Sequence, residues 1–445
     1  MGSEAIIAAM VAIFLVLAYF GTPVAFALIG AVLVGTAFGG VSYPAIVGQL
    51  FNGVNSVPLL AVPFFLLVAE LMSSSDITLK IIRFVQSLVG HIRSGLAQVN
   101  AVFSMFFAGI SGSSTSDVAA NSRILLPAMK REGYDPASSA ALIAAASTIA
   151  NMIPPSIMGV VYGATGGVSI AAIFLGGAVP GVLVGVGLMA FSYFFVHAGV
   201  PAPRASFRHI AGAARASALP LMVPFIIMGG IVGGLFTPTE AGMVAVMFIL
   251  LVLLPFTVRG HLRKLPRDFV HAGVLYSLPM IAVAAASAFA WLFTYLGGAG
   301  AVSEYMHSVA GTNPIAIMFL IVLVLIVVGQ FIDAIPAIVV FMPIIKSLVD
   351  LGEINPIHMG VVVIVTLALG LITPPYGLSL LLATSFAKVP FSAGLRKSIP
   401  LYGLFLAVIS ALILVPDLSL WLPRLVVPEA AGCFQAPGGE NYICP

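Results

Sequence analysis

The sequence predicts an all-α, polytopic membrane protein, and three observations carry the prediction. Of the 445 residues, 61% are hydrophobic and only 7% are charged, whereas about a quarter of a soluble domain is charged. The mean hydropathy is +1.17. Apolar stretches of spanning length recur along the whole chain. The formal net charge of +3 is spread over short loops, so it bears on orientation and gives no indication of nucleic-acid binding.

Ten apolar stretches are candidate membrane crossings. They are residues 5–20, 24–39, 55–72, 138–163, 169–197, 217–234, 240–257, 271–297, 357–387 and 398–416. Two further stretches, 99–131 and 314–350, are apolar but interrupted at their midpoints by polar or glycine-containing sequence. Lipid cannot satisfy a broken backbone, so such breaks persist only where protein or water covers them. We therefore interpret both stretches as re-entrant helical hairpins.

Fifteen of the 18 Lys and Arg residues fall in alternate loops. They are Lys80, Arg83, Arg93, Lys130, Arg131, Arg204, Arg208, Arg215, Arg259, Arg263, Lys264, Arg267, Lys388, Arg396 and Lys397. The loops expected at 40–54, 164–168, 235–239 and 298–313 contain no Lys or Arg. Ten crossings and two hairpins then place every basic loop in the cytoplasm and both termini outside. The first hairpin enters from the cytoplasm and the second from outside.

An inverted repeat is also expected. Thr22-Pro23 recurs as Thr237-Pro238, and Asp135-Pro136 recurs as Asn355-Pro356. Pro63 and Pro127 likewise have counterparts at Pro279 and Pro343. Each half holds five crossings, an odd number, so the second copy must insert upside down. We predict one repeat over residues 1–212, the other over 213–425, and a disordered tail over 426–445.

Four breaks pair across this pseudo-symmetry. Ser111–Asp117 pairs with Gly329–Asp333, and Asn151–Ser156 pairs with Thr373–Gly377. Each of the last two contains a proline pair, which removes amide donors and leaves carbonyl oxygens one turn back without partners. Carbonyl and hydroxyl oxygens are ligands that small hard cations prefer, and half-helix N-termini favour an anion. These breaks therefore predict an ion site.

Each polar residue at the breaks also has a structural interpretation. A single serine in a membrane helix usually serves packing, whereas the whole cluster exceeds what packing requires. Asp333 is either functional, as acids at membrane depth usually are, or the N-cap of the outgoing half-helix. Asp117 could likewise be an N-cap. Arg123 could meet a substrate carboxylate, snorkel, or pair with Asp117.

Four motifs taken together carry a family resemblance. They are Ser111-Gly-Ser-Ser-Thr-Ser-Asp-Val-Ala-Ala-Asn-Ser-Arg123, Asn151-Met-Ile-Pro-Pro-Ser156, Gly229-Gly-Ile-Val-Gly-Gly-Leu-Phe-Thr-Pro-Thr-Glu-Ala241 and Leu371-Ile-Thr-Pro-Pro-Tyr-Gly377. Over about residues 4–425 the chain resembles the large membrane subunit of tripartite ATP-independent periplasmic (TRAP) transporters, the DctM-like family. The segment after residue 425 does not share this resemblance.

The resemblance implies sodium-coupled uptake of a small carboxylate at the bacterial inner membrane. It implies two partners, a small four-helix membrane subunit and a soluble periplasmic substrate-binding protein, and an elevator mechanism with no cofactor or transition metal. Carried over by position, the sodium-binding residues are Ser111, Ser113, Ser114, Ser116, Asn151, Gly329, Asp333 and Thr373. The substrate-binding residues are Ser114, Thr115, Arg123, Pro154, Pro374 and Tyr376.

Other functions stay open at this point. The main alternative is a self-sufficient ion-coupled anion carrier or exchanger that needs no binding protein. An intramembrane enzyme using Asp117 with Asp333 is disfavoured, because nothing obliges the two acids to meet. A channel is disfavoured too, since selectivity filters repeat around an oligomer axis whereas these breaks pair within one chain.

Overall fold

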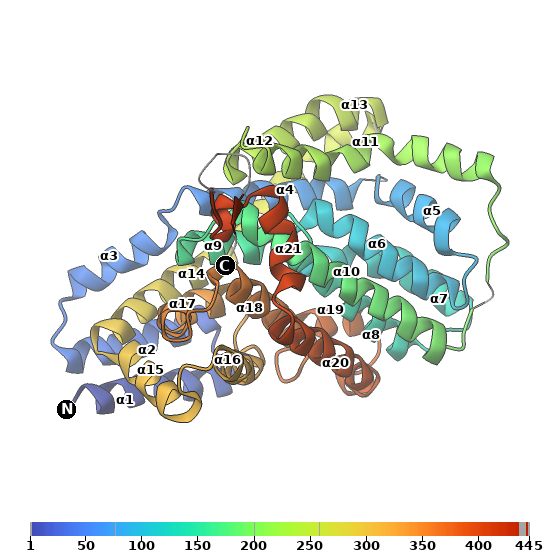
Figure 1. Ribbon diagram of the computed structural model, residues 1–445. Coiled ribbons are helices and arrows are strands. Elements are labelled where there is room, and N and C mark those ends of the chain that lie inside the picture. Colours follow the sequence, from blue (N-terminus) through green and yellow to red (C-terminus); the bar gives the residue numbers. More distant parts are fainter. Residues whose placement is uncertain (1, 76, 200, 258, 436–441, 444–445) are drawn as a thin grey trace.

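The computed structural model describes residues 2–75, 77–199, 201–257, 259–435 and 442–443. Helices make up nearly all of the described chain (Figure 1). The first half contains α1 (Ser3–Tyr19), α2 (Val24–Gly39), α3 (Tyr43–Val54), η1 (Pro58–Leu60), α4 (Ala61–Ser74), α5 (Ile77–Val89), α6 (Gly95–Ser111), α7 (Ser114–Arg131), α8 (Pro136–Ser147), η2 (Thr148–Asn151), α9 (Ile157–Gly166) and α10 (Ile170–Phe195).

The second half contains more short elements than the first. It contains α11 (Phe207–Val232), α12 (Pro238–Phe248), η3 (Ile249–Leu253), α13 (Leu254–Thr257), η4 (Arg259–Lys264), α14 (Leu265–Tyr295), α15 (Gly298–Ala310), α16 (Pro314–Val328), α17 (Ala334–Leu351), α18 (Pro356–Gly370), α19 (Leu378–Ala387), α20 (Phe391–Leu414), α21 (Asp417–Val426), η5 (Glu429–Ala431), β1 (Phe434–Gln435) and β2 (Tyr442–Ile443). The two hairpins are α6–α7 and α16–α17.

All ten stretches expected to cross the membrane coincide with helices. By length and composition, however, only five described helices are individually long and apolar enough to span, or six if the bent pair Tyr43–Val54 and Pro58–Ser74 counts as one. The difference has a physical reason. Helices α1 and α2 have 17 and 16 residues, short of the roughly 20 that a bilayer requires, and the proline pairs divide the stretches 138–163 and 357–387 into shorter helices.

The loops expected at 40–54 and 298–313 were wrong in part, because they contain α3 and α15. Both are amphipathic helices, too short and too polar to register as crossings. On α3, the exposed apolar residues Tyr43, Val47 and Phe51 recur every four residues and form one stripe.

The tail expected to be disordered includes η5 and the antiparallel pair β1–β2. Cys433 is disulfide-bonded, whereas Cys444 lies outside the described residues.

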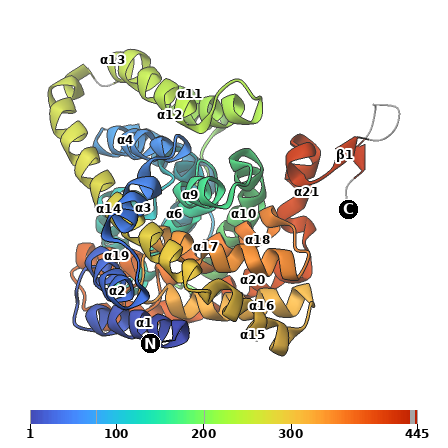
Figure 2. The same ribbon diagram turned by 90° about the vertical axis from the view of Figure 1, so that its left-hand side faces the viewer.

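The helices form two groups. Helix α14 packs on α2, α3 and α4, and α12 packs on α4, so the first spans of both halves make one framework. Figures 1 and 2 show α11–α13 along one edge, α1 and α2 along the opposite edge, and α14 running between them. The other group contains the hairpins and broken helices. In this core α9 packs on α17, α19 packs on α7 and α8, and α10 packs on α18 and α20.

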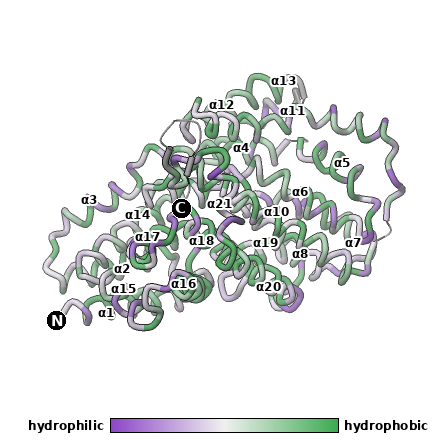
Figure 3. The backbone as a smooth tube through the Cα atoms, viewed as in Figure 1, coloured by the Kyte–Doolittle hydropathy of each residue, from purple (hydrophilic) through white to green (hydrophobic). Residues whose placement is uncertain are grey.

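Polar connections gather at opposite ends of the molecule. The α7–α8 and α10–α11 connections lie at one end, and the α2–α3 and α14–α15 connections lie at the other (Figures 1 and 3). The first two connections adjoin Lys130, Arg131 and Arg204, whereas the residues between α2 and α3 include no basic side chain. Two of the loops that the sequence predicts on one side therefore lie at the same end of the structure.

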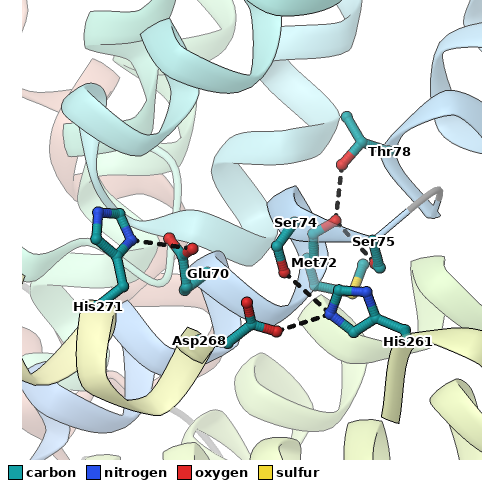
Figure 4. Close-up of polar contacts among 8 residues, drawn as sticks. All are labelled: Glu70, Met72, Ser74, Ser75, Thr78, His261, Asp268 and His271. Atoms are coloured by element: carbon teal, nitrogen blue, oxygen red, sulfur yellow. Dashed lines mark hydrogen bonds and ion pairs between the residues drawn. The ribbon is translucent and has the colours of Figure 1, made fainter. Parts of the chain in front are cut away.

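Two histidines join α4 to the segment that contains η4 and the start of α14 (Figure 4). His271 Nδ1 lies 3.0 Å from Glu70 Oε1. His261 Nε2 lies 2.7 Å from Asp268 Oδ2 and 3.2 Å from Ser74 Oγ. The His271–Glu70 and His261–Ser74 contacts join α4 of the first half to η4 and α14 of the second, and the His261–Asp268 pair holds η4 against α14.

Close backbone packing holds α10 against the first proline break. A Cβ atom added to Gly177 would lie 2.4 Å from the Met152 carbonyl oxygen, whereas nothing lies within 4 Å of such an atom at Gly273 of α14. We expect Gly177→Ala to destabilise the protein by about 1–3 kcal/mol through this clash. Gly273→Ala should be neutral or stabilising by up to about 1 kcal/mol. Thermal unfolding in detergent compares the two variants, and equal melting temperatures would contradict the packing.

Candidate functional site

The two hairpin tips and the two proline breaks line one cavity of about 700 Å³. The first tip contributes residues 112–115 and the second contributes Asp333. Asn151 and Tyr376 come from the two breaks. Framework residues close the opposite wall, from the α1–α2 turn, α4 and α14. The cavity therefore lies between the core and the framework, where segments from both halves of the chain meet.

Each tip sits on the break of its own half through backbone contacts. In the first half, Ile157 N donates to Gly112 O at 3.2 Å. Gly112 has a φ of +58°, and a Cβ there would lie 2.2 Å from Pro155 O. Only glycine combines this left-handed conformation with so close an approach. A side chain at this position would separate the tip from the break.

The second half repeats the arrangement. Tyr376 N donates to Gln330 O at 3.0 Å. Gly329 and Gly370 also pack backbone to backbone, since a Cβ on Gly370 would lie 2.8 Å from Gly329 O. The Pro154–Pro155 and Pro374–Pro375 peptide bonds are both cis. The two tip-and-break units thus share the same construction.

Polar groups at the first unit are only partly satisfied. The Ser113 and Thr115 hydroxyls lie 2.9 Å apart. The hydroxyl of Ser156 donates to the Asn151 carbonyl and accepts from Gly159 N at 3.0 Å, so this carbonyl, expected to lack a partner, has one. Ser111 Oγ and Asn151 Nδ2 are buried and have no hydrogen-bond partner among the described residues. Buried polar atoms without partners mark a place where a ligand can supply them.

At the second unit, Asp333 and the Gly370 carbonyl both have hydrogen-bond partners within the protein. Asp333 is the N-cap residue of α17 and accepts from Ala334 N at 2.9 Å. The capping interpretation therefore holds, although the side chain also lines the cavity. The Gly370 carbonyl, expected to lack a partner, accepts from Thr373 N at 3.2 Å and from Thr373 Oγ1 at 3.1 Å.

The structure brings together some of the residues selected from the sequence. Those that line the cavity are Ser113, Ser114, Thr115, Asn151, Asp333 and Tyr376. Those outside its lining are Ser111, Ser116, Arg123, Pro154, Gly329, Pro374 and Thr373. Arg123 is exposed on α7, and no ion pair joins it to Asp117 among the described side chains. Asp117 is not an N-cap, because α7 begins after Ser113.

Several supporting residues were missed. Tyr402 of α20 donates to the Ile372 carbonyl at 2.7 Å and anchors the second break. Ser379 follows that break, with its hydroxyl buried and without a partner. Framework residues Thr22 and Pro279 line the cavity. In the sequence, Thr22 and Pro279 stood out only as markers of the repeat. Nothing in the sequence indicated Tyr402, because it lies on α20 and reaches the break only through the packing of that helix.

Comparison with known proteins places the chain in a family. A family model described as "Tripartite ATP-independent periplasmic transporter, DctM component" matches residues 11–418. The chain belongs to this family. It is thus a large permease subunit of a TRAP transporter, as the sequence motifs indicate.

Curated relatives agree with this membership. The chain is 33% identical to the sialic acid TRAP transporter large permease protein SiaM of Vibrio cholerae, over 92% of this chain and 96% of that protein. It is 35% identical to the C4-dicarboxylate TRAP transporter large permease protein DctM of Pseudomonas aeruginosa, over 84% and 88%. It is 33% identical to the 2,3-diketo-L-gulonate TRAP transporter large permease protein YiaN of Escherichia coli, over 83% and 87%.

A solved structure shares the fold of this TRAP permease. The YdaH transporter of Alcanivorax borkumensis matches with a TM-score of 0.54 and 14% sequence identity, over 83% of this chain and 86% of that chain. At this level of identity the likeness concerns the fold alone.

The close contact between the first hairpin tip and its proline break can be tested at Gly112. We expect Gly112→Ala to reduce uptake tenfold or more, because a clash and a left-handed conformation each cost about 1–2 kcal/mol or more. Gly133→Ala is the matched control, since Gly133 has a φ of +82° but nothing lies within 4 Å of an added Cβ. Initial uptake rates, normalised to the amount of protein in the membrane, compare the two. Equal loss in both variants would assign the effect to backbone conformation alone.

Proposed function

We propose that this TRAP permease is the membrane component of a sodium-coupled importer for a small organic acid. A periplasmic binding protein delivers the acid, and a small four-helix membrane subunit completes the complex at the bacterial inner membrane. The cavity between the two tip-and-break units supports the proposal most directly, because it combines hydroxyl groups, a carboxylate and helix N-termini at one place. Three relatives with acids in their names point to the same substrate class.

The proposed cation sites follow the two units. One sodium ion is held by oxygen atoms of the first tip and break, where Ser111 Oγ is buried without a partner. The other is held at the second unit, where Asp333 supplies a negative charge beside the cavity. Oxygen ligands of this kind suit small hard cations. The anion lies between the units, with Ser114, Thr115 and Tyr376 as its proposed contacts.

The arrangement also suggests how cation and substrate are coupled. Each tip rests on its break through few backbone contacts, so a bound cation can order the tip by bridging the two. We propose that only the loaded core moves past the framework, as in an elevator, and that residues 1–212 and 213–425 act as inverted repeats. Coupling then requires that cation and substrate bind one state more tightly than the other.

The role of Asp333 can be tested by uptake into proteoliposomes. We expect Asp333→Asn to raise the sodium concentration for half-maximal uptake about tenfold, because hydrogen bonds and contacts to a charged group contribute about 1.5–3 kcal/mol. Asp350→Asn, at the far end of the same helix, is the control and should leave the sodium response unchanged. A sodium response of Asp333→Asn that matches the wild type would remove Asp333 from the site.

The requirement for partners is tested separately. Proteoliposomes should take up the acid only when they contain this chain and the small subunit and the binding protein is supplied outside. Omitting the binding protein should reduce uptake to the background of empty liposomes, which serve as the control. Transport by this chain alone at the full rate would favour the self-sufficient carrier.

A further inference from the structure

A second group of buried polar side chains lies within the arms of the first hairpin. Asn121 of α7 donates through Nδ2 to Ser104 Oγ of α6 at 2.9 Å and to Asp117 Oδ1 at 3.2 Å. The side chains of Ser104, Asp117 and Asn121 are all fully buried. Ser104 is seven residues from Ser111 along α6, about 10 Å at the rise of an α-helix. Asp117 lies in the first turn of α7, directly after the tip, and the group extends from there into the hairpin arms.

These hydrogen bonds leave acceptor atoms without partners. Asp117 Oδ2 and Asn121 Oδ1 are both buried and accept no hydrogen bond from the described residues by distance and angle. Asn121 Nδ2 donates to both neighbours and the Ser104 hydroxyl, which interacts with Asp117, is a further donor, so three donor hydrogens face four acceptor oxygens. Buried polar atoms normally find partners. These oxygen atoms therefore form a candidate binding site for a positively charged ligand.

The negative charge of Asp117 also favours a bound cation. Helices α4, α6, α8 and α19 and the turn η2 all pack against α7. Residues 95–111, 136–151 and 378–387 contain no charged side chain, and Glu70 of α4 is an acid engaged with His271. On α7 itself, Arg123 is exposed and Lys130 and Arg131 belong to the last turn. A buried carboxylate without a counter-charge is strongly disfavoured, so a bound cation would supply what the protein does not.

We propose that Asp117, Asn121 and Ser104 form a further sodium-binding site, inside the arms of the first hairpin. Asp117 Oδ2, Asn121 Oδ1 and Ser104 Oγ offer carboxylate, amide and hydroxyl oxygens, which a hard monovalent cation prefers. A proton on Asp117 would let Oδ2 donate to Asn121 Oδ1 and would leave the carboxyl neutral, whereas a cation bound by both oxygens keeps the carboxylate charged, so the two occupants differ in their dependence on sodium. Its ligands differ from those that the proposed function assigns to the ion at the tip, and the proposal rests on the same sodium-coupled function.

Direct measurement of sodium binding tests this site. The full-length permease, purified in nanodiscs, is titrated with NaCl at constant ionic strength set by choline chloride, and sodium stabilisation and bound radioactive sodium are measured. Asp117→Asn keeps the size of the side chain and removes its charge. It should bind one sodium ion fewer than the wild type and lose the corresponding stabilisation. Glu132→Gln, which changes an exposed acid at the end of the same helix, should match the wild type.

Two further variants separate the outcomes. Ser104→Ala removes a neutral ligand and should weaken sodium binding several-fold, which keeps the test valid if Asp117→Asn does not fold. Ser114→Ala affects the tip alone, so Asp117→Asn should lower the sodium count of Ser114→Ala as well. The proposal is overturned if Asp117→Asn and Ser104→Ala both keep the wild-type sodium count and midpoint. It is also overturned if Asp117→Asn is more stable at every sodium concentration with an unchanged titration, because Asp117 would then be a neutral acid.

Discussion

The close contact between each hairpin tip and its own proline break is the constraint on which the rest of the structure depends. A re-entrant hairpin exposes a broken backbone at membrane depth, and lipid offers nothing to satisfy it. Here the broken helix supplies the missing partners, through Ile157 N to Gly112 O in one half and Tyr376 N to Gln330 O in the other. The cavity exists because these two mutually supporting breaks face each other across the core.

The framework has a complementary role. Helix α14 extends from the η4 end of the molecule to α15 and packs on α2, α3 and α4 of the other half. The Glu70–His271 and Asp268–His261 contacts hold its first turns in place. Because α4 and α14 both line the cavity and α14 also packs on hairpin arm α17, the framework forms the wall opposite the tips and contacts the core beside it.

Much of this fold could be predicted from the sequence, because a bilayer allows few alternatives. Apolar length predicted the spans, glycine and polar residues predicted the hairpins near 112 and 330, and the proline pairs predicted the breaks. The amphipathic helices α3 and α15 were missed since they are neither apolar throughout nor long. At the site, the sequence could select Asn151 and Asp333 by their cost in the membrane. It could not show that Asn151 O is bonded to Ser156 or that Tyr402 reaches Ile372, because those partners depend on packing.

The exchange of packing partners between the halves has a consequence for how the chain can be divided. Helix α9, which follows the first break, packs on hairpin arm α17 of the second half, and α19 packs on α7 and α8 of the first. Either half alone would lose these contacts and expose apolar surface of its hairpin arm and of the helix after its break. We therefore expect the two halves, expressed as separate polypeptides, to require each other for folding.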